Sequence, residues 1–262
     1  MGRPRRPNTE DRMEARLKEG RGQGYGIEYC PWLTTYDVPS IGTSERVRGN
    51  TVPRIYHLLS QLEAYCFLHL DWMKVVVDIR EQVPLLPLDD TKTLAAELGI
   101  RHPMIHGRAA VMTTDFVVTV LHHGETIHYA LSVKYSQELH ERGRRGDRTR
   151  QKLRLEREFW ERQGIRWYVI TEHKFNRTVI RNLRWLHPYY PVTALAPYTA
   201  SEVSKIRMRL EREQDGVLFT DMAAERTDRA LGLEPGSSMQ VARHLWATRQ
   251  WPADLRCPLM PD

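Results

Sequence analysis

Residues 113–135 read TTDFVVTVLHHGETIHYALSVKY and decide the fold class. β-Branched and aromatic residues dominate 113–121 and 126–135, which is typical of strands. The intervening His-His-Gly sequence is typical of a turn, so the whole stretch predicts a β-hairpin. A hairpin of this length needs further elements to cover its faces.

Outward from the hairpin, helical and strand patterns follow one another along the chain. Apolar residues spaced by three and four between 52 and 72 predict an amphipathic helix with Pro53 in its first turn. Short β-branched runs predict further strands, and a helix with an apolar stripe follows the hairpin. This order indicates an α/β core with a mixed sheet flanked by helices. The expected elements besides the first helix are a strand at 75–79, a helix at 91–98, a helix at 148–163 and a strand at 165–171.

After residue 172 the pattern changes to short helices. We expect them at 178–186, 199–213, 218–231 and 238–247, followed by a short extended end. Such a series predicts a small helical or winged-helix-like module. The expected domains are a basic flexible arm at 1–40, a catalytic domain at 41–190 and a partner-docking domain at 191–262.

Composition excludes several classes of protein. The 262 residues are 41% hydrophobic and 27% charged, which is a globular mixture. No apolar stretch approaches the ~18 residues of a membrane span, and the N-terminus lacks the apolar core of a signal peptide. Three scattered cysteines are too few for a disulfide framework or a four-ligand zinc site. We expect a soluble, cytoplasmic protein without membrane contact.

Basic residues gather in two places. The net charge of +6 comes from 39 basic and 33 acidic residues, so their distribution matters more than their sum. Residues 1–22 carry seven basic and four acidic residues, and 138–166 carry ten and six. The second segment is the more concentrated and favours contact with DNA phosphates. Its candidate DNA-binding residues are Arg142, Arg144, Arg145 and Arg148.

Four residues are candidates for a catalytic site. Strand alternation lets Asp115 and Lys134 converge, either as a simple ion pair or as part of a site. Glu63 lies at the border of the apolar stripe of the helix at 52–72, and Glu156 lies on the stripe of the later helix. Three carboxylates leaning toward one core beside a lysine favour a hard divalent cation and phosphodiester hydrolysis.

Longer stretches carry a resemblance to a known family. Asp115 followed by Ser132-Val133-Lys134 resembles the restriction-endonuclease core, in which an acid on one strand precedes an x-Lys motif on the next. The wider context resembles the TnsA family, the end-cutting nuclease subunits of heteromeric bacterial transposons. The resemblance runs from about residue 40 to 175 and is looser beyond. The stretches that carry it are SQLE at 60–63, VDIREQ at 77–82, GIRHP at 99–103, MTTDF at 112–116, VKYS at 133–136 and LEREFW at 155–160.

The resemblance implies roles for individual residues. Glu63, Asp115 and Lys134 match the family's catalytic acid, acid and lysine. Glu63, Asp115 and the Val133 backbone carbonyl would hold Mg²⁺, with Mn²⁺ as a substitute. Ser132 stands where the family usually has Glu or Gln, and a serine offers only a neutral hydroxyl to a cation. Glu156 or Glu63 is expected to compensate.

The resemblance also implies an activity and partners. The expected protein is a bacterial DNA endonuclease that cleaves the 5′ strand at transposon ends, works at the nucleoid and belongs to a cut-and-paste system. Its expected partners are transposon-end DNA, a TnsB-type transposase and a TnsC-type AAA+ ATPase. A CRISPR-associated transposon is one expected source.

Other functions stay open at the level of sequence. A non-catalytic adaptor that keeps the nuclease fold would explain Ser132, whereas Glu63, Asp115 and Lys134 together favour an enzyme. An independent restriction enzyme would cut specific sites without partners. Residues 80–82 are expected either to brace the catalytic helix or to approach DNA. His102 precedes a proline and is expected to be a structural loop residue.

Overall fold

The chain divides into two compact units, residues 1–175 and 176–262. The computed structural model describes residues 9–38, 43–213 and 221–259. The division falls earlier than the boundary expected after residue 190, because the helix at 177–186 belongs to the second unit. None of the helices in the described ranges is long and apolar enough to cross a membrane.

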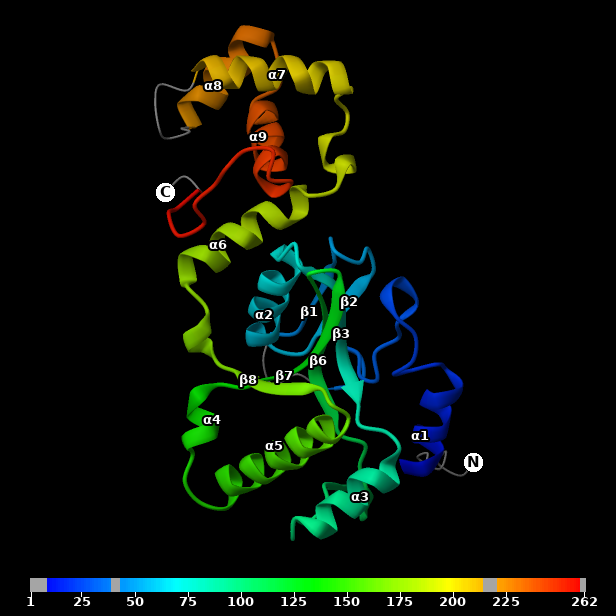
Figure 1. Cartoon of the computed structure of the whole chain (residues 1–262). Helices are drawn as coiled ribbons and strands as arrows, with labels where there is room; N and C mark the ends of the chain where they lie inside the picture. Colours follow the sequence, from blue (N-terminus) through cyan, green and yellow to red (C-terminus); the bar gives the residue numbers. More distant parts are fainter. Residues whose placement is uncertain (1–8, 39–42, 214–220, 260–262) are drawn as a thin grey trace, which may run out of the picture. The chain divides into compact units, whose positions relative to one another are not determined.

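The first unit is built on a four-stranded mixed sheet with the order β3-β6-β7-β8 (Figure 1). The hairpin predicted from residues 113–135 forms its two central strands, β6 and β7, with a turn at His123 and Gly124. β3 pairs antiparallel with β6, and β8 pairs parallel with β7. The strands of this sheet are β3 (Val76–Pro84), β6 (Thr113–His122), β7 (Glu125–Val133) and β8 (Arg166–Ile170).

Apolar side chains alternate between two cores on opposite faces of the sheet. Phe116 and Val118 face a core that includes Phe67 of α2 (Gln61–Trp72). Val117 faces the other core, which includes residues of α3 (Leu88–Glu97) and α5 (Arg144–Arg162). The sheet is therefore covered by helices on both faces, and the expected mixed α/β core is confirmed. Two short hairpins and one short helix complete the unit: β1 (Glu45–Arg48) with β2 (Ile55–Leu58), β4 (Met104–Ile105) with β5 (Arg108–Ala109), and α4 (Ser136–His140).

The helix expected from residue 52 begins only at Gln61. The preceding residues form strand β2 instead, and the Ser60 hydroxyl accepts a hydrogen bond from the Glu63 backbone N–H at 3.1 Å. The Glu63 side chain in turn accepts from the Ser60 hydroxyl and the Leu59 N–H, each at 2.9 Å. The expectation was wrong because the spacing of apolar residues continues across a strand, while the Ser-x-x-Glu start signal was not used.

Residues 9–38 fold against the first unit rather than forming the expected flexible arm. They contain α1 (Thr9–Lys18) and the 3₁₀ helix η1 (Gly26–Glu28). Trp32 is buried, and its backbone N–H donates to the Gln82 carbonyl at 3.2 Å. The Tyr29 hydroxyl donates to the Glu81 carbonyl at 3.0 Å. This segment therefore lies beside β3, at the end of the strand order. The rest of the expected arm, residues 1–8 and 39–40, lies outside the described residues.

The second unit is helical, as expected for the C-terminal region. α9 packs against α6, α7 and α8, and its buried face includes Val241 and Leu245. No β-strand occurs within 176–213 or 221–259, so these residues do not include the hairpin of a winged helix. The helices are α6 (Arg177–Leu186), α7 (Ala200–Glu213), α8 (Asp221–Leu231) and α9 (Ser237–Ala247). Short 3₁₀ helices are η2 (Glu172–Lys174) in the first unit, and η3 (His187–Tyr189) and η4 (Val192–Leu195) in the second.

Candidate active site

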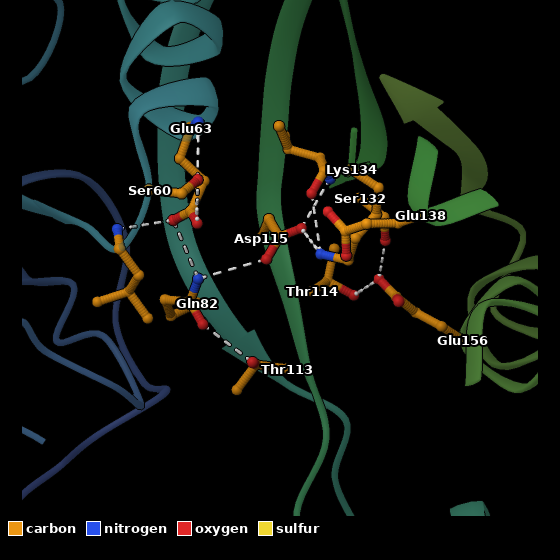
Figure 2. Close-up of polar contacts among 12 residues, drawn as sticks. Ser60, Glu63, Gln82, Thr113, Thr114, Asp115, Ser132, Lys134, Glu138 and Glu156 are labelled. Atoms are coloured by element: carbon orange, nitrogen blue, oxygen red, sulfur yellow. Dashed lines mark hydrogen bonds and ion pairs between the residues drawn. The ribbon is translucent and has the colours of Figure 1, made fainter. Parts of the chain in front are cut away.

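Two acidic side chains from different elements meet around one amide. Glu63 lies in the first turn of α2, and Asp115 lies on β6; both are buried. The Gln82 Nε2 atom lies 3.3 Å from Glu63 Oε2 and 3.4 Å from Asp115 Oδ1 (Figure 2). The Gln82 Oε1 atom accepts a hydrogen bond from the Thr113 hydroxyl at 2.9 Å, which fixes the NH₂ group toward the two carboxylates. Gln82 thus connects the two acids.

The backbone at Gln82 has a left-handed conformation, with φ of +50°. This conformation is uncommon for a residue other than glycine and costs about 1 kcal/mol or more. It changes the side-chain alternation of β3: Ile79 packs in the α2 core, whereas Val83 packs in the α5 core. The hydrogen bond from Trp32 holds the Gln82 carbonyl at this point. The strand distortion therefore lies where the two acids meet.

Lys134 contacts the second carboxylate oxygen of Asp115. Its Nζ atom donates to Asp115 Oδ2 at 2.8 Å and to the Val133 carbonyl oxygen at 2.9 Å. The Val133 backbone N–H also donates to Asp115 Oδ2, at 2.7 Å. The convergence of Asp115 and Lys134 expected from strand alternation is therefore present. Lys134 directly follows β7, so the end of that strand positions the ammonium group.

The oxygen atoms beside Lys134 suit a cation. A carboxylate oxygen of Asp115 and the carbonyl oxygen of Val133 already converge on the Lys134 ammonium group. Mg²⁺ takes oxygen ligands and is held by few carboxylates together with water and phosphate. The donor set therefore fits such an ion, with Glu63 as the second carboxylate. The expected convergence of three carboxylates was wrong, since the described residues contain no group of three acidic, His or Cys side chains placed to hold a metal.

Glu156 contacts Ser132 rather than joining the two acids. Its Oε1 atom accepts hydrogen bonds from the Ser132 hydroxyl at 2.5 Å and the Thr114 hydroxyl at 2.7 Å. Trp167 Nε1 lies 3.3 Å from the Ser132 hydroxyl oxygen on the same face of the sheet. The position where the resemblance implies Glu or Gln is thus occupied by a serine that binds a buried carboxylate from α5. A carboxylate is present near this position, but it comes from a different element.

Burial changes the protonation of these groups. It raises the pKa of the Glu63 carboxyl to about 7, with a further contribution from the nearby Asp115 carboxylate. Burial also raises the pKa of Glu156 to about 7, and the Asp115 carboxylate again makes the second-largest contribution. Burial alone would lower the pKa of Lys134, but the Asp115 carboxylate outweighs that effect and the pKa rises. Lys134 is therefore a cation at neutral pH, suited to charge stabilisation rather than to proton abstraction.

A pocket of about 480 Å³ opens beside Lys134. Glu156 and two further basic residues of α5, Arg148 and Lys152, line it. The other expected DNA-binding residues, Arg142, Arg144 and Arg145, are exposed at or just before the start of α5 and do not line this pocket. Only Arg148 of the expected basic group thus lies next to the catalytic candidates.

Sequence reasoning missed two residues of the site. The sequence predicts for Gln82 either a brace or an approach to DNA, and the structure shows that its amide contacts both acids. The signal available was a polar residue near the end of β3, next to the buried Glu81. Lys152 was counted only as one of many basic residues, although its spacing of four from Glu156 places both on one side of α5. His102 is a structural loop residue as expected, with ring nitrogens 3.0 Å from oxygen atoms of Thr91 and Pro103.

Comparisons with known proteins agree with this arrangement. A family model described as "TnsA-like endonuclease N terminal" matches residues 74–172. A second model, "TnsA endonuclease C terminal", matches residues 175–255. The chain is 38% identical over 239 residues to the transposon Tn7 transposition protein TnsA of Escherichia coli. The aligned residues cover 91% of this chain and 84% of that protein. The limits of the two family models fall beside the division between the two compact units.

Proposed function

The chain belongs to the TnsA family of transposition endonucleases, and from this premise we propose that it is a metal-dependent enzyme that cleaves the 5′ strand at transposon ends. The observation that carries the proposal is the convergence of Asp115, Lys134 and the Val133 carbonyl beside Glu63. An adaptor without activity would have no need to bury two acids near a lysine, because such groups are costly to bury.

The residues divide the chemistry between them. Asp115, Glu63 and the Val133 carbonyl would hold Mg²⁺, for which Mn²⁺ would substitute. When bound, the ion supplies Lewis-acid activation of the phosphodiester and of a water molecule. Lys134 donates hydrogen bonds toward the developing charge on the phosphate. Gln82 orients both acids through its amide.

Ser132 and Glu156 form an accessory pair. Ser132 cannot supply a charged ligand, and its hydroxyl instead donates to the Glu156 carboxyl group of the neighbouring helix. The short hydrogen bond between the two side chains keeps that carboxylate at the end of β7.

The partners follow from the family and from the surface charge. Transposon-end DNA lies along the basic side of α5, where Arg142, Arg144, Arg145 and Arg148 contact phosphates. A TnsB-type transposase joins the 3′ ends, and a TnsC-type AAA+ ATPase docks on the helical C-terminal unit. The reaction takes place in the bacterial cytoplasm at the nucleoid, with a CRISPR-associated element as one possible setting.

The test is cleavage of a plasmid carrying one transposon end, by the full chain with its transposase and ATPase partners. We expect a 5′-strand cut in Mg²⁺ and in Mn²⁺, and none in EDTA. Asp115→Asn should abolish the cut and keep the thermal unfolding curve of the wild type. Cleavage by the folded Asp115→Asn chain would remove Asp115 from the mechanism. A wild-type chain that assembles with its partners but never cuts would favour the adaptor.

A further inference from the structure

A small hairpin beside the active site exposes two large apolar side chains. β4 (Met104–Ile105) and β5 (Arg108–Ala109) are joined by His106 and Gly107. Met104 is 45% exposed and Ile105 is 52% exposed. Neither side chain contributes to either core of the first unit. Since exposure of adjacent large apolar residues opposes solubility, these residues are candidates for contact with a ligand or partner.

The hairpin lies between two hollows. Met104 and Ile105 line the pocket of about 480 Å³ that also contains Lys134 and Glu156. The same two residues line a second groove of about 600 Å³, which reaches Trp32. The apolar side chains therefore border the space that contains the catalytic lysine. A ligand that reaches Lys134 through this pocket meets them.

The pocket has one basic wall and one apolar wall. Lys134, Arg148 and Lys152 form the basic wall, and Met112 adds to the apolar wall of the hairpin. Lys152 is exposed, and among the described residues its ammonium group has no hydrogen bond or ion pair. Two acids also line the pocket, but both are engaged: Glu156 by hydroxyl groups, and Glu138 by the Tyr135 backbone N–H at 3.2 Å. A nucleotide combines the same two chemistries, an anionic phosphate and an apolar base face.

We propose that this hairpin is a wedge that unstacks the DNA strand beside the cleaved phosphate. Met104 and Ile105 insert at a base step, and the displaced nucleotide enters the adjacent pocket. Its phosphate contacts Lys152 and Arg148. Proteins insert Met, Ile and similar side chains between bases in this way, and the unstacking energy is offset by new contacts. The inference rests on the proposed function, because it takes DNA as the substrate.

Kinetics on two DNA substrates test the wedge. The variant is Met104→Ser with Ile105→Ser, and the control is Val77→Ser, an exposed apolar residue at the start of β3. On fully paired end DNA we expect the double variant to cleave about tenfold or more slowly, since unstacking one step costs a few kcal/mol. On DNA with two mismatched pairs at the cut, which are already unstacked, its rate should approach that of the wild type. Val77→Ser should match the wild type on both.

The contact between the pocket and the phosphate is tested by removing the charge of Lys152 and, separately, the charge of the phosphate. Lys152→Ala should weaken cleavage of natural DNA, while Lys74→Ala, at another exposed lysine of the first unit, should not. Replacing the phosphate of the displaced nucleotide with an uncharged methylphosphonate should remove the difference between wild type and Lys152→Ala. A difference that persists on the neutral analogue would overturn the phosphate contact.

Fluorescence separates this inference from the proposed function. With 2-aminopurine beside the cleavage position, wild-type chain and its partners should increase the fluorescence, also in Ca²⁺ without cutting. The double variant should not. The wedge is overturned if the double variant cuts paired DNA at the wild-type rate. It is also overturned if the double variant is equally slow on paired and mismatched DNA, a result that would indicate a contact with a partner protein. Absence of cutting by the wild type while the fluorescence still rises contradicts the nuclease but supports the wedge.

Discussion

At the scale of single residues, Gln82 is the group that contacts both acids. Its amide donates toward Glu63 and Asp115, and its own orientation is fixed by Thr113. Groups that orient metal ligands typically change metal affinity by about 10–100-fold when removed. Gln82→Met keeps the volume of the side chain and removes both donors.

We predict that Gln82→Met raises the Mg²⁺ concentration for half-maximal cleavage by about 10–100-fold, with activity largely restored at saturating Mg²⁺. Thr113→Val, which removes only the hydrogen bond to the amide oxygen, should give a smaller shift in the same direction. Magnesium titrations of the cleavage rate measure both. A variant with reduced maximal rate and an unchanged magnesium requirement would show that Gln82 acts elsewhere.

Glu156 makes stability depend on pH. Its pKa is about 7 in the folded chain and near the ordinary value when unfolded, so the folded state binds more protons between these values. The free energy of unfolding therefore falls as pH rises from about 4.5 to 7. Glu156→Gln keeps an acceptor for Thr114 and Ser132 but removes the charge.

We predict that Glu156→Gln raises the free energy of unfolding at pH 8 by up to about 3 kcal/mol and changes it little at pH 5. Urea unfolding in EDTA at both pH values measures this difference. Ser132→Ala serves as a comparison, because it removes a hydrogen bond without removing the titrating group. Equal effects of Glu156→Gln at the two pH values would show that folding does not raise the pKa of the Glu156 carboxyl.

At the scale of elements, the hairpin could be predicted because alternation and turn composition agree. The helix at 61–72 was predicted with the wrong start, since the apolar spacing extends back through β2; the Ser60-x-x-Glu63 capping signal marks the true start. The left-handed backbone of Gln82 has no comparable signal, because it results from packing around a non-glycine residue. The folded segment at 9–38 was missed because its contacts are with distant residues, and composition alone does not encode them.

The basic start of α5 gives an element-scale prediction. Arg144 and Arg145 are exposed, and within the described residues Arg145 forms an ion pair with Glu141 at 3.6 Å. Neutralising both to Gln should reduce the slope of log affinity against log salt by about 0.9 for each lost phosphate contact, without changing sequence preference. Fluorescence anisotropy over a salt series measures the slope.

The charge-matched control is a double variant of two exposed arginines of the second unit, Arg229→Gln with Arg256→Gln. Loss on one DNA sequence alone would indicate base contacts.

At the scale of the whole molecule, the proposed catalytic residues and the proposed docking surface belong to different units. Glu63, Asp115 and Lys134 all lie before the division at Phe175, and the expected ATPase-docking surface lies after it. The order of a mixed α/β unit followed by a helical unit could be predicted, because the change from strands to short helices is visible in the apolar spacing. The prediction placed the boundary too late, because the helix at 177–186 has no mark that assigns it to either unit.

The separation of roles predicts a change in transposition products when only the cleavage chemistry is lost. In the proposed mechanism Lys134 stabilises charge at the cut, while a TnsB-type transposase joins the 3′ ends independently. Lys134→Ala should therefore leave the complex assembled and able to join 3′ ends, but unable to release the 5′ strands from donor DNA. Products should shift from simple insertions to cointegrates that contain both backbones. Long-read sequencing of insertions counts the two classes, with Lys74→Ala as the control. A Lys134→Ala strain that still yields only simple insertions would show that another nuclease makes the 5′ cut, since the joined 3′ ends alone cannot free the element.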